Sequence, residues 1–298
     1  MALVSVIIPT HKRAKYLKEA ISSVFLQTYS DWELIIIDDN PLNSEDQKKT
    51  KAVVDTFPFQ EKIKYIPHKN SLGGAAARNT GIGAARGKYI AFLDDDDLWE
   101  ESKLEKQIQL FKKNENLGLV YCKMYGFTGT QKKCVPQDYL VRGDIYKDIL
   151  AMNFMATCTV MVKKECFDKV GMFDVTLPSR QDHDMFLRIC KGYRVDFVEE
   201  YLAGMRLHQN RISRNVEKKQ NGWNLFLKKW KKELDRFPRI KNRVYASYNW
   251  EMGRVYYYCQ QYSSARRHLF KVIRYNKFKF KAHILFLASL LRIDIRLK

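Results

Sequence analysis

Four aspartates stand side by side at Asp94–Asp97, directly after an apolar run, in the segment YIAFLDDDDLW. Like charges at this spacing raise one another's pKa values and oppose folding unless a cation lies among them. If the preceding strand continues through the run, alternation places Asp94 and Asp96 on one face of it. Adjacent carboxylates suit Mg²⁺ or Mn²⁺, which bind one or two carboxylates together with substrate phosphates. The run is therefore a candidate divalent metal site, with an ordinary acidic turn as the alternative.

The last aspartate of the run also has a structural interpretation. Asp97 is expected to be the N-cap of the following helix, with Glu100 three residues later as its capping-box partner.

The elements that must position these carboxylates follow from the hydrophobic pattern. Apolar runs alternate with helical periodicity in the first hundred residues, which is typical of a doubly wound α/β sheet. The expected strands are LVSVIIPT, WELIIIDDN, KIKYIPH and KYIAFLD, and the expected helices lie near 14–28, 44–56 and 75–86. Ligands bind beyond the carboxyl ends of such strands, where IIPTHKR, IIIDDN, IPHKNSLGG and FLDDDD collect polar groups.

The alternation loosens after residue 117. Strands are expected at 117–127 and 157–164 and helices at 144–153 and 181–192, which favours an antiparallel addition to the sheet. Beyond about residue 214 no segment has the pattern of a strand. We therefore predict two domains, residues 1–213 and a helical region at 214–298.

Four motifs, in order, carry a resemblance to a known family: SVIIPTHKR, ELIIIDDN, GGAAARNTGIGAARGKYIAFLDDDD and GMFDVTLPSRQDHDMFLR. Over roughly residues 3–210 the chain resembles the family 2 glycosyltransferases, which are inverting enzymes with the GT-A fold. The resemblance implies a Rossmann-like nucleotide-binding mixed sheet flanked by helices, followed here by an all-α region.

The resemblance also implies a nucleotide-sugar donor, most often a UDP-sugar. The matching positions for the nucleotide are Pro9, Thr10, Arg13, Asp39 and Arg78. A carboxylate such as that of Asp39 can accept the imide N–H of uracil. Structural alternatives remain open: Thr10 caps the first helix, Asp39 joins Asp38 in a turn with Asn40 and Pro41, and Arg78 is a solvated side chain.

By the same resemblance, Asp96 ligates Mn²⁺ or Mg²⁺ between the diphosphate oxygens, while Asp94 or Asp95 faces the ribose. The metal would neutralise charge on the departing nucleoside diphosphate. His208 matches a histidine that reaches the metal or the diphosphate, and imidazole suits Mn²⁺. A solvent-facing loop histidine is the alternative.

The catalytic base implied by the family is an aspartate in a Glu-Asp pair that opens a helix. Here the pair is Gln181 and Asp182, so the base would be Asp182, without the neighbouring negative charge. The alternative for Asp182 is an acidic residue in a first helical turn, stabilised by the helix dipole.

Positive charge is concentrated in the last part of the chain. Residues 211–298 contain 23 Lys and Arg against 5 Asp and Glu, of 53 against 33 in the whole chain. A helical stripe of Trp223, Leu227, Trp230, Leu234 and Phe237, with lysines beside it, favours a helix lying on an anionic membrane; a core-facing stripe is the alternative. The segment MGRVYYYCQQYSSARRHLFKVI resembles one tetratricopeptide-like helix pair.

Composition limits the remaining possibilities. The six cysteines are scattered without C-x-x-C spacing, so neither a zinc site nor a disulfide framework is expected, and a reducing cytoplasm is the predicted compartment. The first apolar run ends at a proline and is expected to be a strand rather than a secretory leader. No apolar run is long enough to span a bilayer. The positive charge of residues 211–298 favours peripheral association with the inner face of the cell membrane.

We therefore predict a metal-dependent inverting hexosyltransferase that extends a surface polysaccharide or a lipid-linked oligosaccharide. One alternative is a polyanion-binding protein whose basic tail grips nucleic acid, with a nucleotide-binding remnant domain; no nucleic-acid-binding motif supports it, and nucleic acid is not an expected partner. Another is a nucleotidyltransferase, but that class is expected to carry a glycine-rich loop after the first strand, which IIPTHKRAKYL lacks.

Overall fold

The computed structural model describes residues 4–134, 139–207, 216–275, 279–293 and 295. The chain divides into two compact units. The first consists of Met1–Tyr146, Phe154–Val175 and Gln181–His208, and the second of Lys147–Asn153, Thr176–Arg180 and Gln209–Lys298. The boundary expected between residues 213 and 214 falls in a segment outside the described residues and stays a prediction.

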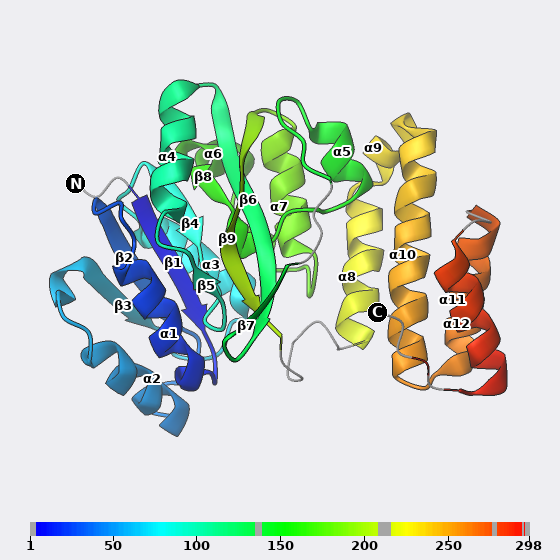
Figure 1. Ribbon diagram of the computed structural model, residues 1–298, viewed down its shortest axis with the longest axis horizontal. Helices are drawn as coiled ribbons and strands as arrows, with labels where there is room; N and C mark the ends of the chain where they lie inside the picture. Colours follow the sequence, from blue (N-terminus) through cyan, green and yellow to red (C-terminus); the bar gives the residue numbers. More distant parts are fainter. Residues whose placement is uncertain (1–3, 135–138, 208–215, 276–278, 294, 296–298) are drawn as a thin grey trace. The chain divides into compact units, whose positions relative to one another are not determined.

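The first unit is built on a nine-stranded mixed sheet with the order β3-β2-β1-β4-β8-β6-β9-β5, to which β7 adds beside β6 (Figure 1). The strands are β1 Val4–Thr10, β2 Trp32–Asp38, β3 Ile63–Pro67, β4 Tyr89–Phe92, β5 Leu98–Trp99, β6 Leu117–Thr128, β7 Gln131–Cys134, β8 Met161–Lys163 and β9 Arg194–Arg206. The first four strands in the spatial order are parallel, and β8 is antiparallel to both of its neighbours.

Helices flank this sheet. They are α1 Ala14–Phe25, α2 Glu45–Asp55, α3 Gly74–Ala84, α4 Lys103–Lys113, α6 Lys164–Val170 and α7 Gln181–Cys190, and α5 Tyr146–Ala151 precedes β8 in the chain. α3 packs on β1 and β2, whereas α4 packs on β6 and β9. The apolar runs of β1 and β2 are buried along nearly their whole length, as expected for strands covered on both faces.

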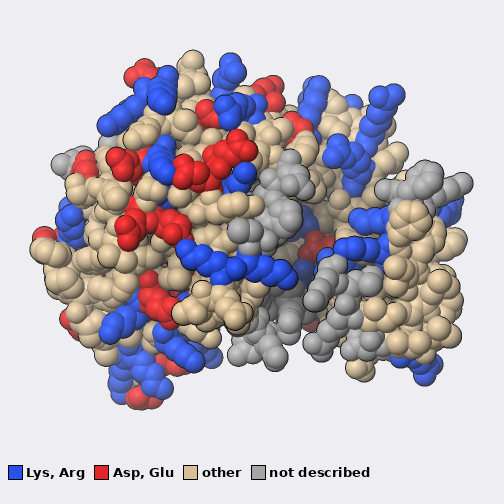
Figure 2. Space-filling view, viewed as in Figure 1, with Lys and Arg blue, Asp and Glu red and all other residues tan. Residues whose placement is uncertain are grey.

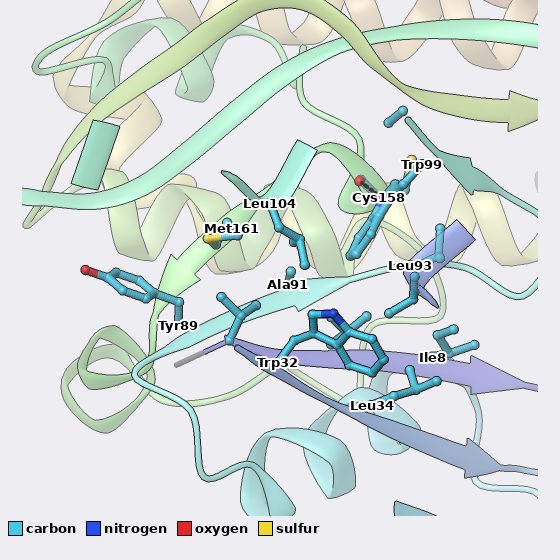
Figure 3. Packing of buried hydrophobic residues seen from close by; sticks show 14 of the residues in the cluster. Ile8, Trp32, Leu34, Tyr89, Ala91, Leu93, Trp99, Leu104, Cys158 and Met161 are labelled. Atoms are coloured by element: carbon cyan, nitrogen blue, oxygen red, sulfur yellow. Dashed lines mark hydrogen bonds between the residues drawn. The ribbon is translucent and has the colours of Figure 1, made fainter. Parts of the chain in front are cut away.

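One core cluster joins the parallel and antiparallel parts of the sheet. Figure 3 shows Ile8, Leu34 and Ala91 of the parallel strands packing with Trp99, Leu104 and Met161 from later in the chain. The side chain of Trp99 is also fixed by its Nε1–H, which donates to the carbonyl of Cys158 at 2.8 Å.

The predicted α/β fold is confirmed, with one difference in the second half of the sheet. The antiparallel addition is present at β8, but β6 and β9 pair in parallel, with β-bulge irregularities in their register. β9 was not predicted. Its sequence, RVDFVEEYLAGMR, mixes charged and apolar residues without strict alternation, and its adjacent Glu199 and Glu200 are both exposed.

The described part of the second unit beyond residue 215 is helical. Its helices are α8 Val216–Lys229, α9 Lys231–Arg236, α10 Pro238–Tyr258, α11 Tyr262–Tyr275 and α12 Phe280–Leu291. α10 packs against α8, α9 and α11, and α11 packs against α12. Gly253 permits the close approach of α10 and α11, since a Cβ there would lie 2.9 Å from the Leu269 side chain. None of the described helices combines the length and apolarity that crossing a bilayer requires.

The aromatic stripe runs from α8 into α9 and faces the interior of the second unit. Trp223, Trp230 and Leu234 are buried, and the guanidinium of Arg180 lies 3.1 Å from the centroid of the Trp223 ring. The stripe is therefore a core-facing one, and the prediction that it lies in a membrane interface is wrong. The physical reason is that one amphipathic helix has the same pattern whether its apolar side meets lipid or protein.

Candidate active site

The carboxyl ends of three parallel strands meet at one edge of the first unit's sheet. β1 and β2 pair in register, so that Thr10 lies beside Asp38. β4 pairs with the other side of β1, and the N–H of Leu93 donates to the carbonyl of Ile7. The residues that follow β4 therefore lie beside the end of β1, at the edge where open α/β sheets bind ligands.

The four aspartates form a turn after β4. The strand ends at Phe92, and the N–H of Asp97 donates to the carbonyl of Asp94 at 3.1 Å. The expected strand alternation of Asp94 and Asp96 is therefore wrong, because the strand ends before the run begins and the backbone turns within it. We call Asp94–Asp97 the acidic turn; within it Asp95, Asp96 and Asp97 are buried.

Two arginines from different elements neutralise the acidic turn. Nη1 of Arg13 lies 2.7 Å from Oδ2 of Asp96 and 3.2 Å from Oδ1 of Asp95. Nη2 of Arg78, on α3, donates to Oδ1 of Asp94 at 2.5 Å. The cations that four adjacent carboxylates require are thus residues of the chain itself, and both had been expected to contact the nucleotide.

Burial raises the pKa of Asp95 to about 7; Arg13 opposes this rise, whereas the neighbouring Asp96 adds to it. Burial, followed by the charges of Asp94 and Asp96, also raises the pKa of Asp97 well above its usual range. Burial thus disfavours the charged form of both carboxyls, and a cation bound at the turn would lower both pKa values.

The expected helix cap at Asp97 is wrong. The following helix, α4, begins only at Lys103, with Ser102 at its N-cap, because the short strand β5 intervenes and pairs with β9. Oδ1 of Asp97 instead accepts the backbone N–H of Arg206 at 3.1 Å.

Arg206 is a site residue that the sequence analysis missed. Its Nε donates to the carbonyl of Asp96 at 3.0 Å, and its guanidinium lies 4.7 Å from the Tyr16 ring centroid and 4.5 Å from that of Phe127. It therefore braces the acidic turn from β9. Its position in the sequence could have indicated a role in the site, because Arg206 stands two residues before the candidate metal ligand His208. His208 itself lies outside the described residues.

The carboxylate of Asp39 is fully engaged by the loop that precedes α3. Its two oxygens accept hydrogen bonds from His68 Nδ1, Ser71 Oγ and the backbone N–H groups of Leu72 and Gly73, at 2.7 to 2.9 Å. Although burial acts to raise it, these hydrogen bonds lower the pKa of Asp39. A carboxylate offers about four acceptor positions, so contact with uracil would require the release of one of these donors.

Asp38 forms the turn given as its structural alternative. Its Oδ1 accepts both the backbone N–H and the side-chain Nδ2 of Asn40, and its Oδ2 accepts the hydroxyl of Tyr65. Burial nevertheless raises the pKa of Asp38.

The two remaining candidates at this edge differ in how far they are engaged. Thr10 does not cap α1, which begins at Ala14 without a side-chain cap. Its buried hydroxyl interacts with Asp95 and lowers the pKa of that carboxyl, whereas the buried Nε of Arg78 has no hydrogen-bond partner among the described residues. Pro9 lies within β1 opposite Ile37, partly buried. The Nε of Arg78 is thus left for a ligand beside the acidic turn.

The donor chemistry of the acidic turn fits a hard divalent ion, because several carboxylate oxygens come together there. Among the described residues, however, no group of three or more His, Cys, Asp or Glu side chains is arranged as a metal site. Asp96 is paired with Arg13, so an ion bound by Asp96 would take the place of that guanidinium.

A chain of contacts links the acidic turn to α7, which carries Asp182. Asn79, next to Arg78 on α3, pairs with both backbone groups of Phe173 at 2.9 Å. Arg188 of α7 donates to the carbonyls of Val170, Gly171 and Met172, which immediately precede Phe173. This network holds α7 relative to α3 within the first unit.

Asp182 lies in the first turn of α7 and is partly buried. Its Oδ1 accepts the N–H of His183 at 2.8 Å. The acidic turn and Asp182 come from separate elements, and the role of Asp182 as base stays a prediction.

This geometry, an acidic turn at the carboxyl edge of a mixed sheet, belongs to the GT-A class of glycosyltransferase folds, and the solved structures agree. TarS of S. aureus, residues 1–349, in complex with UDP-GlcNAc, has a TM-score of 0.58 at 15% identity, covering 99% of this chain and 93% of that one. The mannosyltransferase PcManGT of Pyrobaculum calidifontis, in complex with GDP-Man and Mn²⁺, has a TM-score of 0.64 at 14% identity, covering 97% and 86%.

The family follows from the sequence comparisons. The profile described as glycosyl transferase family 2 matches residues 5–172, and the chain belongs to this family. An uncharacterized glycosyltransferase of Methanocaldococcus jannaschii is 32% identical, over 77% of this chain and 80% of its own length. TuaG of Bacillus subtilis, provisionally named for teichuronic acid biosynthesis, is 30% identical over 80% and 91%. A longer relative from Rickettsia bellii is matched over 34% of its length. The protein is thus a glycosyltransferase.

Proposed function

We propose that this glycosyltransferase moves a hexose, with inversion, from a UDP-sugar to a hydroxyl of a growing surface polysaccharide or lipid-linked oligosaccharide. The observation that carries the proposal is the acidic turn, braced by arginines at the ligand-binding edge of the sheet. The UDP-GlcNAc complex of TarS supports the choice of donor, and the name of TuaG supports a cell-surface polymer as the acceptor.

In this proposal Asp96, together with His208, would hold Mn²⁺ or Mg²⁺, and Asp94 or Asp95 would face the ribose. The ion would neutralise charge on the departing diphosphate. Displacement of Arg13 from Asp96 would make its guanidinium available to phosphate oxygens, with Arg78 and Thr10 supplying further donors and Pro9 lining the nucleotide. Asp39 would contact uracil only after one of the four donors that occupy its carboxylate is released.

Asp182 would act as the base. As the acceptor oxygen attacks the anomeric carbon, Asp182 takes its proton, and the electrons of the breaking carbon–oxygen bond leave with the nucleoside diphosphate. The first turn of α7 favours the ionised carboxylate through the helix dipole.

We further propose that the protein works at the inner face of the cell membrane. The support is the excess of Lys and Arg in residues 211–298, because juxtamembrane cations are attracted to anionic lipid headgroups.

The donor and the metal are tested by one panel. Melting temperature and donor hydrolysis are measured with UDP-, GDP-, CMP- and dTDP-sugars, each with Mn²⁺, Mg²⁺ or EDTA. We expect UDP-sugars to raise the melting temperature only with metal, since a ligand that binds the native state stabilises it. Asp96→Asn should remove this metal-dependent rise. Equal stabilisation in EDTA would contradict the metal role.

Substitution of the base gives the second test. Asp182→Asn should lower kcat by about 10²- to 10⁴-fold, the usual contribution of a general base, with an unchanged melting temperature. Asp168→Asn, an exposed aspartate on α6, makes the same change of charge and should leave kcat unchanged. Retention of transfer by the Asp182 variant would contradict the assignment of Asp182 as the base. A protein that only binds polyanions would turn over no donor at all.

A further inference from the structure

The last described helix of the second unit, α12, is apolar on two opposite sides. Its sequence is FKAHILFLASLL, with Lys281 as the only Lys, Arg, Asp or Glu side chain. Ala282, Leu285 and Ala288 on one side are buried where α12 packs on α11 and α10. An amphipathic surface helix would carry polar residues on the other side, so α12 departs from that pattern.

The opposite side of α12 exposes large apolar side chains. Phe280, Ile284, Leu287 and Leu291 follow the spacing of one helical stripe, and the relative exposures of Phe280, Leu287 and Leu291 are 73%, 58% and 70%. We call these four residues the α12 stripe. Leu290 is exposed beside it. Isolated exposed leucines are ordinary, whereas a contiguous stripe marks an interaction surface.

The apolar surface continues onto α11. The ring of Phe270 on α11 is 52% exposed and lies 6.4 Å, between centroids, from the ring of Phe286 on α12. The exposed apolar area therefore spans two helices of the same compact unit.

The surroundings of the stripe are cationic. Residues 252–293 contain nine Lys and Arg and no Asp or Glu. Lys271, Arg274, Lys281 and Arg292 are exposed on or next to α11 and α12. In Figure 2 the surface over these two helices is tan and blue, without red in view. Apolar side chains bordered by cations are the composition of a helix that lies in an anionic membrane interface.

We propose that the α12 stripe inserts into the interface of an anionic bilayer, with α12 parallel to the membrane plane. The helix has 12 residues, about 18 Å at the helical rise, which is well short of the ~30 Å hydrocarbon core. This inference rests on the proposed function, which includes membrane association. It adds the surface that makes the membrane contact. A second copy of the chain fits less well, because two such surfaces would bring cations against cations without a carboxylate between them.

The test measures co-sedimentation of the full chain with vesicles of phosphatidylcholine alone and of phosphatidylcholine mixed with phosphatidylglycerol. The wild-type chain should bind only the anionic vesicles. Leu287→Glu with Leu291→Glu should weaken binding by about tenfold for each leucine, as expected when the burial of a leucine is lost. The single variant Phe280→Gln should also weaken it, and it alters only one exposed ring.

The matched control is Leu26→Glu with Leu42→Glu, which adds the same charge at exposed leucines of the first unit. This control should bind like the wild type. Equal binding by the stripe variants, or no binding by the wild type, would overturn the proposal. Wild-type dimers in analytical ultracentrifugation that the stripe variants abolish would instead assign the surface to a second copy.

Hydrolysis of the nucleotide sugar is measured in parallel on every variant. Stripe variants that lose lipid binding but keep hydrolysis and the wild-type melting temperature support the inference alone. Lipid binding through the stripe without turnover of any donor would leave this inference standing while the proposed function fails.

Discussion

Arg13, Arg78 and Arg206 reach the acidic turn from three separate segments, which are the N-cap of α1, α3 and β9. Arg13 and Arg78 pair with carboxylates, whereas Arg206 donates to the backbone carbonyl of Asp96. Burying several carboxylates is costly unless each is hydrogen-bonded. At the residue scale, the three guanidinium groups make the turn compatible with a folded chain before any ligand binds.

Arg206→Met tests the brace on the acidic turn. Methionine keeps an apolar stem between Tyr16 and Phe127 but loses the hydrogen bond to the Asp96 carbonyl. Donor affinity should fall about tenfold, or about 1.4 kcal/mol, as for one charge-assisted hydrogen bond. Isothermal titration with the donor and metal measures it.

The control is Glu19→Gln, which removes only the ion pair of Arg206 with the exposed Glu19. Such surface pairs contribute little, so donor affinity should stay near that of the wild type. An unchanged affinity in Arg206→Met would show that the turn holds its shape without the Arg206 side chain.

At the element scale, α3 couples the sheet to the site. It carries Arg78, which pairs with Asp94, and Asn79, which anchors Phe173. The helix lies very close to β1 at Gly81, where a Cβ would meet Cγ2 of Ile7 at 2.5 Å. The small residues of GGAAARNTGIGAAR thus allow α3 to lie close to the sheet, and this position of α3 determines where Arg78 and Asn79 are held.

Gly81→Ala should lower the free energy of unfolding by about 1–3 kcal/mol, because Ile7 is fully buried and has little room to move. It should also weaken donor binding by shifting Arg78. Chemical denaturation and donor titration measure the two effects.

Gly83→Ala is the matched control on the same helix, since a Cβ there meets nothing within 4 Å. It should be neutral or stabilising by up to about 1 kcal/mol through helix propensity. Equal effects of both substitutions would contradict the packing argument.

At the scale of the whole molecule, charge is distributed unequally between the two units. The second unit holds most of the excess of Lys and Arg, and it also contains a half-buried histidine, His268. The Nδ1 of His268 donates to Oδ1 of Asn249 at 3.0 Å, and its ring stacks on Tyr256.

The stability of the chain should fall as the pH drops below about 6.5. Burial, aided by Lys271 and Arg267, lowers the pKa of His268 to about 4, against about 6.5 in an unfolded chain. Between these values the unfolded state binds more protons, so the stabilisation present above pH ~6.5 is lost toward pH ~4. Scanning calorimetry of His268→Gln should show a smaller loss of melting temperature over this window. Parallel curves for both proteins would contradict it.

Much of this architecture is predictable because periodicity is a local property. The apolar runs that become β1 to β4, the helices between them and the polar strand ends are each encoded within about ten residues. The order of the four motifs further indicates the family, and Asp38 with Asn40 forms the expected turn.

The tertiary structure alone decided the features that depend on residues distant in sequence. These features are long-range or loop contacts, which have no local periodicity. They are the turn of the acidic run, the contact of Arg206 with Asp97 across 109 positions, and the four donors around Asp39. The same holds for which helix exposes its apolar side: α8 and α12 both carry apolar stripes, and only packing determines that the first is buried and the second is exposed. A stripe specifies that a surface is apolar, whereas the neighbours that cover it are set by the fold.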